Sequence, residues 1–286
     1  MRSMRPDPLV RVRSLLIPTP GGSIPALLLS PRSPAENATG VLWLHGGGYI
    51  AGMKEMVHMS RAVDLVKRFG AVVLSPGYRL APWAPYPAAM DDCYAALRYL
   101  KDHAASLGAR GDQLMVGGES AGGGLCAAVC IRARDEGTVN VAFQMPLYPM
   151  LDDRDSDSSR NNHGRVWNTR RNHLAWRLYL RKADRAHLPP YAAPARLTDF
   201  SALPPAYSFV GDGELFYDET LRYFAKLKAA GVPAELDVYH TDMHAFDMMD
   251  PDAELSLQAA SAFDRHFADA QARFFAPQRD GGTAFL

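Results

Sequence analysis

The stretch QLMVGGESAGGG, residues 113–124, places five glycines around a single serine, directly after an apolar run. Residues 118–122 read Gly-Glu-Ser-Ala-Gly, the pattern G-x-S-x-G, between an expected strand and an expected helix. In that context the serine lies on a sharp strand-to-helix turn, with its hydroxyl exposed at the top of a sheet. Cβ atoms beside it would collide with neighbouring elements, and Gly118 and Gly122 avoid this collision. The stretch therefore predicts Ser120 as a nucleophile.

A second glycine cluster, HGGG at residues 45–48, follows another short apolar run. Residues without side chains let backbone N–H groups approach a developing oxyanion closely. We expect Gly47, Gly48 and Ala121 to supply these N–H groups, and His45 to hold the loop by a hydrogen bond to the backbone. The alternative is a phosphate-binding loop, but the sequence has neither G-x-G-x-x-G in a nucleotide-binding setting nor a following Lys-Ser or Lys-Thr pair.

Ser120 needs a base, which in a fold with this serine turn comes last, after the acid. The histidines after Ser120 are His163, His173, His187, His240, His244 and His266. Only His240 and His244 follow the last expected strand. His244 is set deeper in the loop and precedes Ala-Phe, which can anchor it, so His244 is the predicted base.

The acid is expected in FVGDGELFYDE, residues 209–219, after the preceding strand. Four carboxylates compete there. Asp218 is expected to cap the next helix and Glu219 to lie in its first turn. Glu214 lies further past the strand than Asp212 and can reach across to the histidine loop. Glu214 is the predicted acid, and Asp212 stays open as the alternative.

Short apolar runs alternate with longer helical patterns along the whole chain. Strands are expected at 10–17, 24–30, 41–44, 71–75, 113–117, 142–147, 206–211 and 235–240, and helices at 57–69, 87–104, 121–136, 218–230 and 253–270. PTPGGS, between the first two strands, is typical of a hairpin turn. The alternation predicts an α/β fold, with a mostly parallel eight-stranded sheet flanked by helices and with its chemistry at the carboxyl ends of the strands.

Residues 152–190 break this alternation with a polar stretch followed by WNTRRNHLAWRLYL. Amphipathic aromatic side chains need a surface to pack on, so we expect a reduced helical cap. It is inserted into a single domain, 1–286, which begins with a short segment, 1–13. Candidates to line the substrate pocket are Tyr49, Trp83, Trp167, Trp176 and Phe216, with core packing as the alternative for each.

The composition excludes several classes of protein. Lys plus Arg and Asp plus Glu both number 31, so the net charge is zero and nothing favours binding to nucleic acid or to an anionic membrane. No stretch approaches the roughly 18 apolar residues of a membrane span. Of three cysteines, Cys126 and Cys130 lie four apart on an expected helix, which favours core packing over a disulfide or a metal site. We expect a cytoplasmic protein.

Together the motifs resemble those of the hormone-sensitive-lipase-like group of α/β-hydrolases, from about residue 14 to residue 267. The segments concerned are HGGG (45–48), YRLAP (78–82), YPAAMDD (86–92), GESAGG (118–123), YPMLDD (148–153), LPPAY (203–207) and HAF (244–246). The resemblance implies hydrolysis of short-chain acyl esters through an acyl-enzyme, without cofactor or metal, with Ser120 as nucleophile and His244 as base. It aligns GDGE (211–214) with the family's acid motif and puts Glu214 where Asp is commoner.

Several alternatives remain open at this point. An amidase, a lactonase or an acetyl-hydrolase would use the same residues, because nothing in them selects the leaving group. A non-catalytic small-molecule-binding protein on this scaffold typically loses the base, whereas His244 is present. The expected partner is a small ester, and a homodimer, frequent in the resembling family, is left open.

Overall fold

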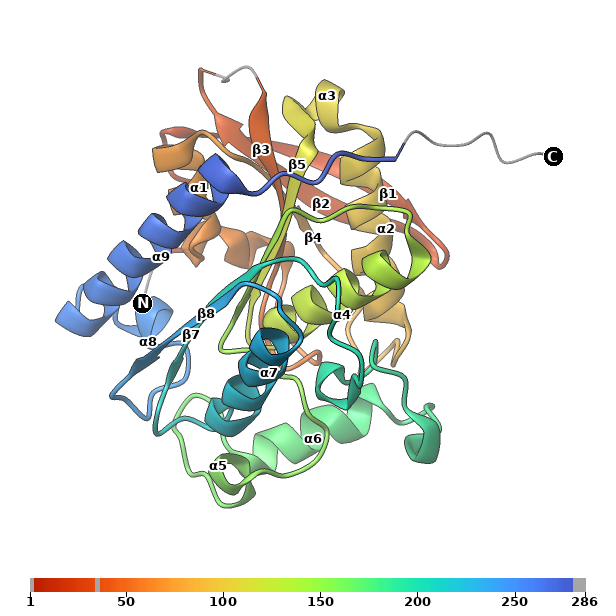
Figure 1. Cartoon of the computed structure of the whole chain (residues 1–286), viewed down its shortest axis with the longest axis vertical. Coiled ribbons are helices and arrows are strands. Elements are labelled where there is room, and N and C mark those ends of the chain that lie inside the picture. The colour runs from red at the N-terminus through yellow and green to blue at the C-terminus, as the bar shows by residue number, and fades with distance from the viewer. Residues whose placement is uncertain (1–2, 34–36, 280–286) are drawn as a thin grey trace.

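A computed structural model describes residues 3–33 and 37–279, so the first two residues of the predicted segment 1–13 lie outside it. Its centre is one eight-stranded sheet with the strand order β1-β2-β4-β3-β5-β6-β7-β8 (Figure 1). The strands are β1 (Val10–Thr19), β2 (Gly22–Pro31), β3 (Ala38–Leu44), β4 (Val72–Pro76), β5 (Ala109–Glu119), β6 (Phe143–Leu147), β7 (Ala206–Gly211) and β8 (Ala234–Tyr239). All eight predicted strands are therefore confirmed.

Helices cover both faces of the sheet (Figure 1). The α-helices are α1 (Ala62–Phe69), α2 (Ala88–Asp102), α3 (Ala104–Leu107), α4 (Ala121–Glu136), α5 (Asp157–Arg160), α6 (Thr169–Tyr179), α7 (Tyr217–Ala229), α8 (Phe246–Met249) and α9 (Glu254–Arg273). Three 3₁₀ turns are η1 (Lys54–Met59), η2 (Arg185–His187) and η3 (Pro194–Arg196). Helices α5 and α6 lie at one end of the sheet, within residues 152–190, which we call the cap segment.

The pairing of the strands follows the predicted hairpin and parallel pattern. β1 and β2 are antiparallel, and Thr19 pairs with Gly22, so a two-residue turn joins them. β2 is also antiparallel to β4, whereas β4, β3, β5, β6, β7 and β8 are parallel to one another in turn. The carboxyl ends of the parallel strands therefore meet at one edge of the sheet, where the chemistry is expected.

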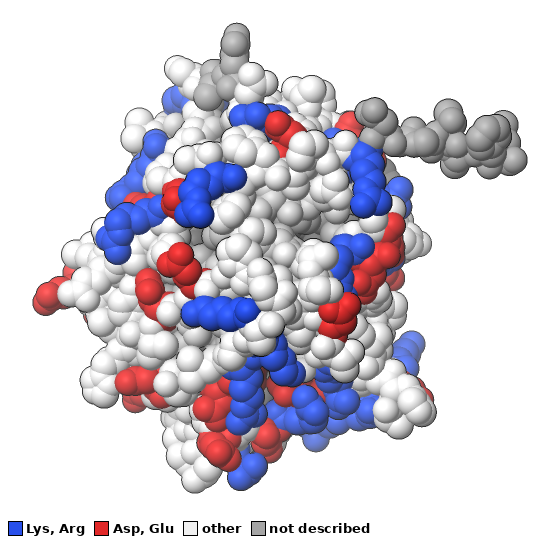
Figure 2. All heavy atoms as spheres, viewed as in Figure 1, with Lys and Arg blue, Asp and Glu red and all other residues white. Residues whose placement is uncertain are grey.

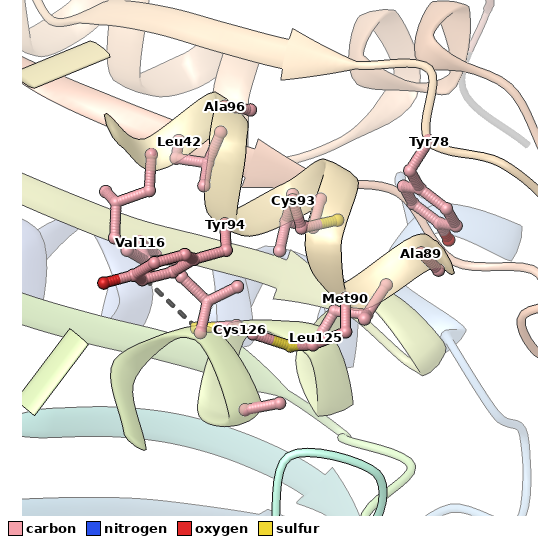
Figure 3. Close-up of a cluster of buried hydrophobic side chains, with 14 of the residues drawn as sticks. Leu42, Tyr78, Ala89, Met90, Cys93, Tyr94, Ala96, Val116, Leu125 and Cys126 are labelled. Carbon is pink, nitrogen blue, oxygen red and sulfur yellow. Dashed lines mark hydrogen bonds between the residues drawn. The ribbon is translucent and has the colours of Figure 1, made fainter. Parts of the chain in front are cut away.

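Alternate side chains of β3 pack on opposite faces of the sheet. Leu42 and Leu44 pack in one core cluster with α2 and α4, whereas Val41 and Trp43 pack in another with α1 and α9. Figure 3 shows the first cluster, in which Cys93, Met90, Leu125 and Cys126 meet Leu42 and Val116. Cys126 and Cys130 are buried and free, and the Cys126 thiol donates a hydrogen bond to the Val116 carbonyl at 3.3 Å. Their predicted role in the core is confirmed.

One predicted helix, 57–69, is two elements, because the chain is η1 before Ser60 and α1 after it. The Ser60 hydroxyl donates to the Val57 carbonyl at 2.8 Å and accepts from the Ala62 N–H at 3.0 Å. A serine side chain that satisfies nearby backbone groups in this way offers the chain an alternative to continuous helix. The helix predicted at 87–104 is likewise divided, at His103, into α2 and α3.

Backbones approach one another closely where β5 passes into α4. An ideal Cβ on Gly122 would lie 2.0 Å from the Leu44 carbonyl oxygen and 2.6 Å from that of His45. A Cβ on Gly118 would lie 2.6 Å from the same Leu44 oxygen. Because these obstacles are backbone atoms of β3 and the loop after it, they cannot turn aside as a side chain can. The glycines at 118 and 122 are therefore required for α4 to start against β3.

Gly122→Ala is expected to lower the free energy of unfolding by about 3 kcal/mol, because α4 or β3 must shift to admit the methyl group. Urea denaturation measures this loss. Gly111→Ala is the matched control, since a Cβ there meets nothing within 4 Å. Equal stability of the two variants would contradict the proposed constraint.

Candidate active site

Ser120 lies between the end of β5 and the start of α4, in a backbone conformation that L-residues rarely adopt. Its φ is 56° and its ψ is −118°. The turn is held by hydrogen bonds from the Ser120 N–H to the Leu147 carbonyl at 3.0 Å and from the Met150 N–H to the Ser120 carbonyl at 2.9 Å. A strained residue fixed by its surroundings is typical of functional sites. The side chain is thereby held at the carboxyl edge of the sheet.

The structure brings Ser120, His244 and Glu214 together from the ends of three strands, β5, β8 and β7. The Ser120 hydroxyl donates to His244 Nε2 at 2.9 Å. The opposite nitrogen of the ring, Nδ1, donates to Glu214 Oε2. The three residues are 7%, 5% and 1% exposed. A hydroxyl, an imidazole and a carboxylate linked in this order and shielded from water match the arrangement that activates a serine nucleophile.

The alternative acid, Asp212, makes a different pair. It accepts from His240 Nδ1 at 2.8 Å, and the His240 side chain is 98% exposed. The hydrogen bond from His240 lowers the pKa of Asp212, and the same contact raises the pKa of His240. Asp212 and His240 thus form a separate surface pair, whereas Glu214 and His244 form the buried one.

Burial is the largest influence on the Glu214 carboxyl and raises its pKa, while the charge and hydrogen bond of His244 act in the opposite direction. Oε1 of Glu214 is buried and has no hydrogen-bond partner among the described residues. The stabilisation of this carboxylate therefore depends on His244. A positive imidazolium is the state that the carboxylate favours most strongly.

The glycine loop follows β3 and lies beside Ser120. Gly47 and Gly48 have positive φ values of 116° and 61°, and Cβ atoms on them would meet the Ala51 carbonyl oxygen at 2.2 Å and the Trp167 ring at 2.1 Å. Among the hydrogen bonds of residues 3–33 and 37–279, none uses the N–H of Gly47, Gly48 or Ala121. Within the described chain these three N–H groups are therefore unbonded, as the role predicted for them requires.

His45 holds this loop, as its sequence context predicts. Its Nδ1 donates to the Gly46 carbonyl at 2.8 Å, and its ring stacks on Tyr78 with 4.1 Å between centroids. Burial lowers the pKa of His45 to about 4, so the ring is neutral at neutral pH. The Tyr78 hydroxyl also donates to the His45 carbonyl at 2.8 Å.

Two aromatic rings, Tyr148 and Phe216, pack edge-on against the His244 imidazole. The ring centroids are 5.2 Å and 5.1 Å away, with interplanar angles of 81° and 78°. Phe216, a predicted pocket residue, is fully buried beside the base. The sequence analysis did not single out Tyr148, although it begins the motif YPMLDD. The two rings restrict the rotation of the imidazole.

A buried ion pair anchors the loop that carries His244. Arg61 Nε donates to Asp247 Oδ2 at 2.8 Å, and Arg61 NH2 donates to the Asp247 carbonyl at 3.1 Å. The side chains are 1% and 0% exposed. The Tyr148 hydroxyl donates to the other oxygen of Asp247 at 3.0 Å. Sequence analysis missed Arg61 and Asp247, because nothing in the local pattern links residues so far apart in the chain.

Glu119, directly before the serine, is buried against the same cluster. Its Oε1 accepts from the Trp43 indole N–H at 2.9 Å. Burial, and to a smaller extent the charge of Asp247, raise the pKa of Glu119 to about 8. The side chain is therefore protonated at neutral pH and adds no negative charge beside Arg61, which is already paired with Asp247 and, at 3.3 Å, with Asp64.

The other predicted pocket residues differ from one another. The Trp167 ring lies against Gly48, whereas Trp176 packs on Tyr49 with 5.4 Å between centroids. Tyr49 is also stacked on Tyr179 at 4.2 Å, so both Tyr49 and Trp176 fill the space between the sheet and α6. Trp83 does not line an enclosed pocket. It is 79% exposed, because the backbone turn from Leu80 directs it to the surface.

Two carboxylates of residues 209–219, the segment expected to supply the acid, accept hydrogen bonds from the start of the cap segment. Glu219 accepts from the backbone N–H groups of Leu151 at 2.6 Å and Asp152 at 3.2 Å. Asp218 accepts from the Ser158 N–H at 2.9 Å. The predicted capping role of Asp218 is therefore wrong, because its side chain is engaged by α5. Glu219 lies in the first turn of α7, as predicted.

Within 3–33 and 37–279, no three His, Cys, Asp or Glu side chains are grouped so as to hold a metal ion. No helix in that part of the chain combines the length and the apolar character needed to cross a bilayer.

Asp247→Ala is expected to lower the free energy of unfolding by about 3 kcal/mol, because it leaves the buried Arg61 charge with only the longer contact from NH1 to Asp64 Oδ2 at 3.3 Å. Replacing both residues, as Arg61→Met with Asp247→Leu, is expected to recover most of that loss. Denaturant titrations give both values. Asp269→Ala is the control, since it breaks an exposed pair with Arg273 and should cost no more than about 1 kcal/mol. Similar losses in the two single variants would refute the anchoring role.

Glu119 should make stability depend on pH. Because folding raises its pKa from 4.5 to about 8, the folded state keeps a proton that the unfolded state releases. This contribution to stability is complete below about pH 4.5 and is lost as the pH rises through about 8. The free energy of unfolding of Glu119→Gln should fall less steeply over this pH range than that of the wild type. Glu254→Gln, at an exposed position, should show the same slope as the wild type. Identical slopes in urea titrations at several pH values would rule out the effect.

Comparison with known proteins agrees with this geometry. A family model described as the alpha/beta hydrolase fold matches residues 41–248. Esterase LipI of Mycobacterium tuberculosis is 33% identical over 84% of this chain and 76% of its own. Carboxylesterase NlhH of the same species is 34% identical over 78% of this chain and 71% of its own.

The solved structure of a bacterial heroin esterase is also similar, with a TM-score of 0.87 and 32% identity, over 96% of this chain and 86% of that one. The chain therefore belongs to the α/β-hydrolase family, in the hormone-sensitive-lipase-like group of ester hydrolases that its motifs resemble.

Proposed function

We propose that the chain hydrolyses short-chain carboxylic esters through an acyl-enzyme on Ser120, with His244 as the base and Glu214 as the acid. The observation that carries the proposal is the continuous hydrogen-bonded chain from the Ser120 hydroxyl through His244 to Glu214. The free N–H groups of Gly47, Gly48 and Ala121 beside it support the assignment of an oxyanion hole.

In the first half of the reaction the Ser120 oxygen attacks the ester carbonyl carbon. His244 Nε2 takes the hydroxyl proton as the C–O bond forms, and the carbonyl π electrons move to its oxygen. That oxyanion accepts hydrogen bonds from the N–H groups of the glycine loop and of Ala121. Each preorganised donor of this kind contributes about 3 kcal/mol to the stability of the transition state.

The tetrahedral intermediate collapses when its C–O bond to the alcohol breaks. His244 returns the proton to the leaving oxygen, so the alcohol departs neutral and the acyl group stays on Ser120. Water then attacks the acyl carbon while His244 takes one of its protons. The second collapse breaks the bond to the serine oxygen, returns the proton to it, and releases the carboxylic acid.

Glu214 keeps the proton of the resting imidazole on Nδ1, so that Nε2 faces Ser120 as an acceptor. When His244 becomes an imidazolium, the buried carboxylate stabilises the positive charge. The packing of Tyr148 and Phe216 on the ring supports the same orientation.

An amidase, lactonase or acetyl-hydrolase would use the same residues, and the names of the relatives favour esters. An acetyl-hydrolase of Streptomyces hygroscopicus is 30% identical over 81% of this chain, which makes acetyl esters a suitable first substrate. The buried contact between His244 and Ser120 argues against a non-catalytic binding protein. The cytoplasmic location, the homodimer and the boundaries of the cap, 152–190, stay predictions of the sequence.

Ser120→Ala is expected to abolish hydrolysis of p-nitrophenyl acetate and p-nitrophenyl butyrate. Glu214→Gln should lower kcat by about 10³-fold, because the amide cannot stabilise the imidazolium or hold its tautomer. Release of p-nitrophenol measures both rates.

The surface pair provides the matched control. Asp212→Asn changes a carboxylate two positions before Glu214, and His240→Ala removes a histidine four positions before His244. Each variant should leave kcat within about twofold of the wild type. Loss of activity in Asp212→Asn with activity retained in Glu214→Gln would reverse the assignment of the acid. Turnover that survives Ser120→Ala would overturn the proposed mechanism.

A further inference from the structure

Positive charge is concentrated in the cap segment although the whole chain is neutral. Residues 152–190 contain nine Arg and Lys against five Asp, and residues 158–190 contain eight against one. The remainder of the chain therefore carries a negative balance. Figure 2 shows Lys and Arg side chains gathered around the position of α6, with acidic side chains beside them.

Many arginines elsewhere in the protein are paired with a carboxylate, whereas most cations of residues 158–190 have no ion pair among the described residues. Arg79 pairs with Asp92 and Arg132 with Asp91, each at 2.8 Å. Between 158 and 190, the one Arg or Lys that forms an ion pair within the described chain is Arg160, which lies 3.5 Å from Asp157. The cations of that segment without an ion pair are Arg165, Arg170, Arg171, Arg177, Arg181, Lys182 and Arg185.

The aspartates at the start of the cap segment leave this charge in place, because they bind other groups. Asp152 pairs with Arg154 and Asp153 with Arg196, which follows the segment. Asp155 accepts from His173 Nε2 at 2.8 Å. None of these three aspartates therefore forms an ion pair, among the described residues, with a guanidinium group of α6 or of the residues after it.

These cations line two adjoining hollows on the exposed side of α6, of about 660 Å³ and 630 Å³. Arg170, Arg177 and the amide side chains of Asn162 and Asn168 line the first. Arg177 also lines the second, together with Arg181, Arg185 and one carboxylate, that of Asp153, which is paired with Arg196. The amides of Asn162 and Asn168 donate to the backbone carbonyls of Gly213 and Gly164, so the arginines are the groups that would bind a ligand. Guanidinium groups that line a hollow are suited to a carboxylate or another oxyanion.

The first hollow adjoins the candidate active site at two points. Asn168 directly follows Trp167, whose ring lies against Gly48 of the glycine loop. The Asn162 side-chain amide donates to the Gly213 carbonyl at 3.3 Å, and Gly213 directly precedes Glu214. The hollow is therefore joined through the Asn162 side chain to the loop that carries the proposed acid, and its residue Asn168 is the chain neighbour of Trp167.

We propose that the cap segment binds an anionic group of the substrate, so that the enzyme prefers esters bearing a carboxylate or a similar oxyanion. The proposal rests on the proposed ester hydrolysis. A small anion fits better than a lipid surface, because the exposed large apolar side chains of the described chain include only Leu174 from the cap segment. A helix that binds a membrane surface needs a broad apolar face.

The test compares two esters of similar shape, para-acetoxybenzoate with a para carboxylate and para-acetoxybenzamide with a neutral carboxamide, each rate being taken relative to its hydrolysis without enzyme. They share the acetyl group and the aromatic ring, and each releases a phenol that absorbs in the ultraviolet. The wild type should have a higher kcat/KM for the anionic ester. That preference should shrink between about 0.01 M and about 1 M salt, as the Debye length falls from about 30 Å to about 3 Å.

The double variant Arg170→Glu/Arg177→Glu should lower kcat/KM for para-acetoxybenzoate by about tenfold or more and leave para-acetoxybenzamide unchanged. Arg170→Lys/Arg177→Lys keeps the charge and should retain most of the preference. Arg13→Glu, an exposed residue of the edge strand β1, is the matched control and should change neither rate. The neutral ester also reports whether each variant is folded and active.

The outcomes separate this inference from the proposed function. If neither ester is hydrolysed in a way that requires Ser120, the proposed function fails. If the neutral ester is hydrolysed but the charge-reversed variant keeps the wild-type ratio of kcat/KM for the anionic and neutral esters, the anion site alone is refuted. The anion site would also be refuted, in favour of a membrane-binding surface, by a second pair of results. These are an unchanged ratio of kcat/KM for the two esters and binding to phosphatidylglycerol vesicles that requires the arginines.

Discussion

The close approach of β5 and α4 to β3 is the constraint on which the rest of the site depends. The carbonyl oxygens of Leu44 and His45 occupy the space that side chains at 118 and 122 would need. Only with glycine there can the chain turn within one residue, with Ser120 at a φ of 56°. The same turn brings the N–H of Ala121 beside the loop that leaves β3. The nucleophile and the proposed oxyanion donors are therefore consequences of one packing contact.

Buried charges of this protein are paired, whereas many exposed charges of the cap segment are not. Beneath the site, the Arg61 and Asp247 side chains are almost fully buried and fully paired, and Glu119 avoids ionisation through its raised pKa. Burial makes an unpaired charge costly, so these groups can hold the His244 loop only as a matched set. On the cap segment, exposed arginines such as Arg170 and Arg177 have no ion-pair partner among residues 3–33 and 37–279, and water solvates them at little cost. Such charges remain free to attract a ligand.

Local sequence patterns predicted most of the fold, because strand periodicity and glycine motifs act over a few residues. The eight strands, the serine turn and the histidine after the last strand all follow from such patterns and from chain order. The break at Ser60 was missed, since a serine hydroxyl bonding its own backbone leaves no mark on helical periodicity. The exposure of Trp83 was missed because loop geometry, not residue type, decides where it points. Arg61 and Asp247 are 186 positions apart, and only the folded chain reveals their contact.

The choice between two acids illustrates what the folded structure adds. Asp212 and Glu214 both follow β7, and each bonds a histidine that follows β8. The pairs differ in their surroundings rather than in their chemistry. His240 is almost wholly exposed, so water screens its interaction with Asp212 and either partner can separate. His244 is enclosed by Tyr148 and Phe216, where a low dielectric strengthens its attraction to Glu214. The longer carboxylate of Glu214 reaches inward from the loop. Burial therefore distinguishes a pair able to support proton transfer from a pair on the surface, and position along the chain does not.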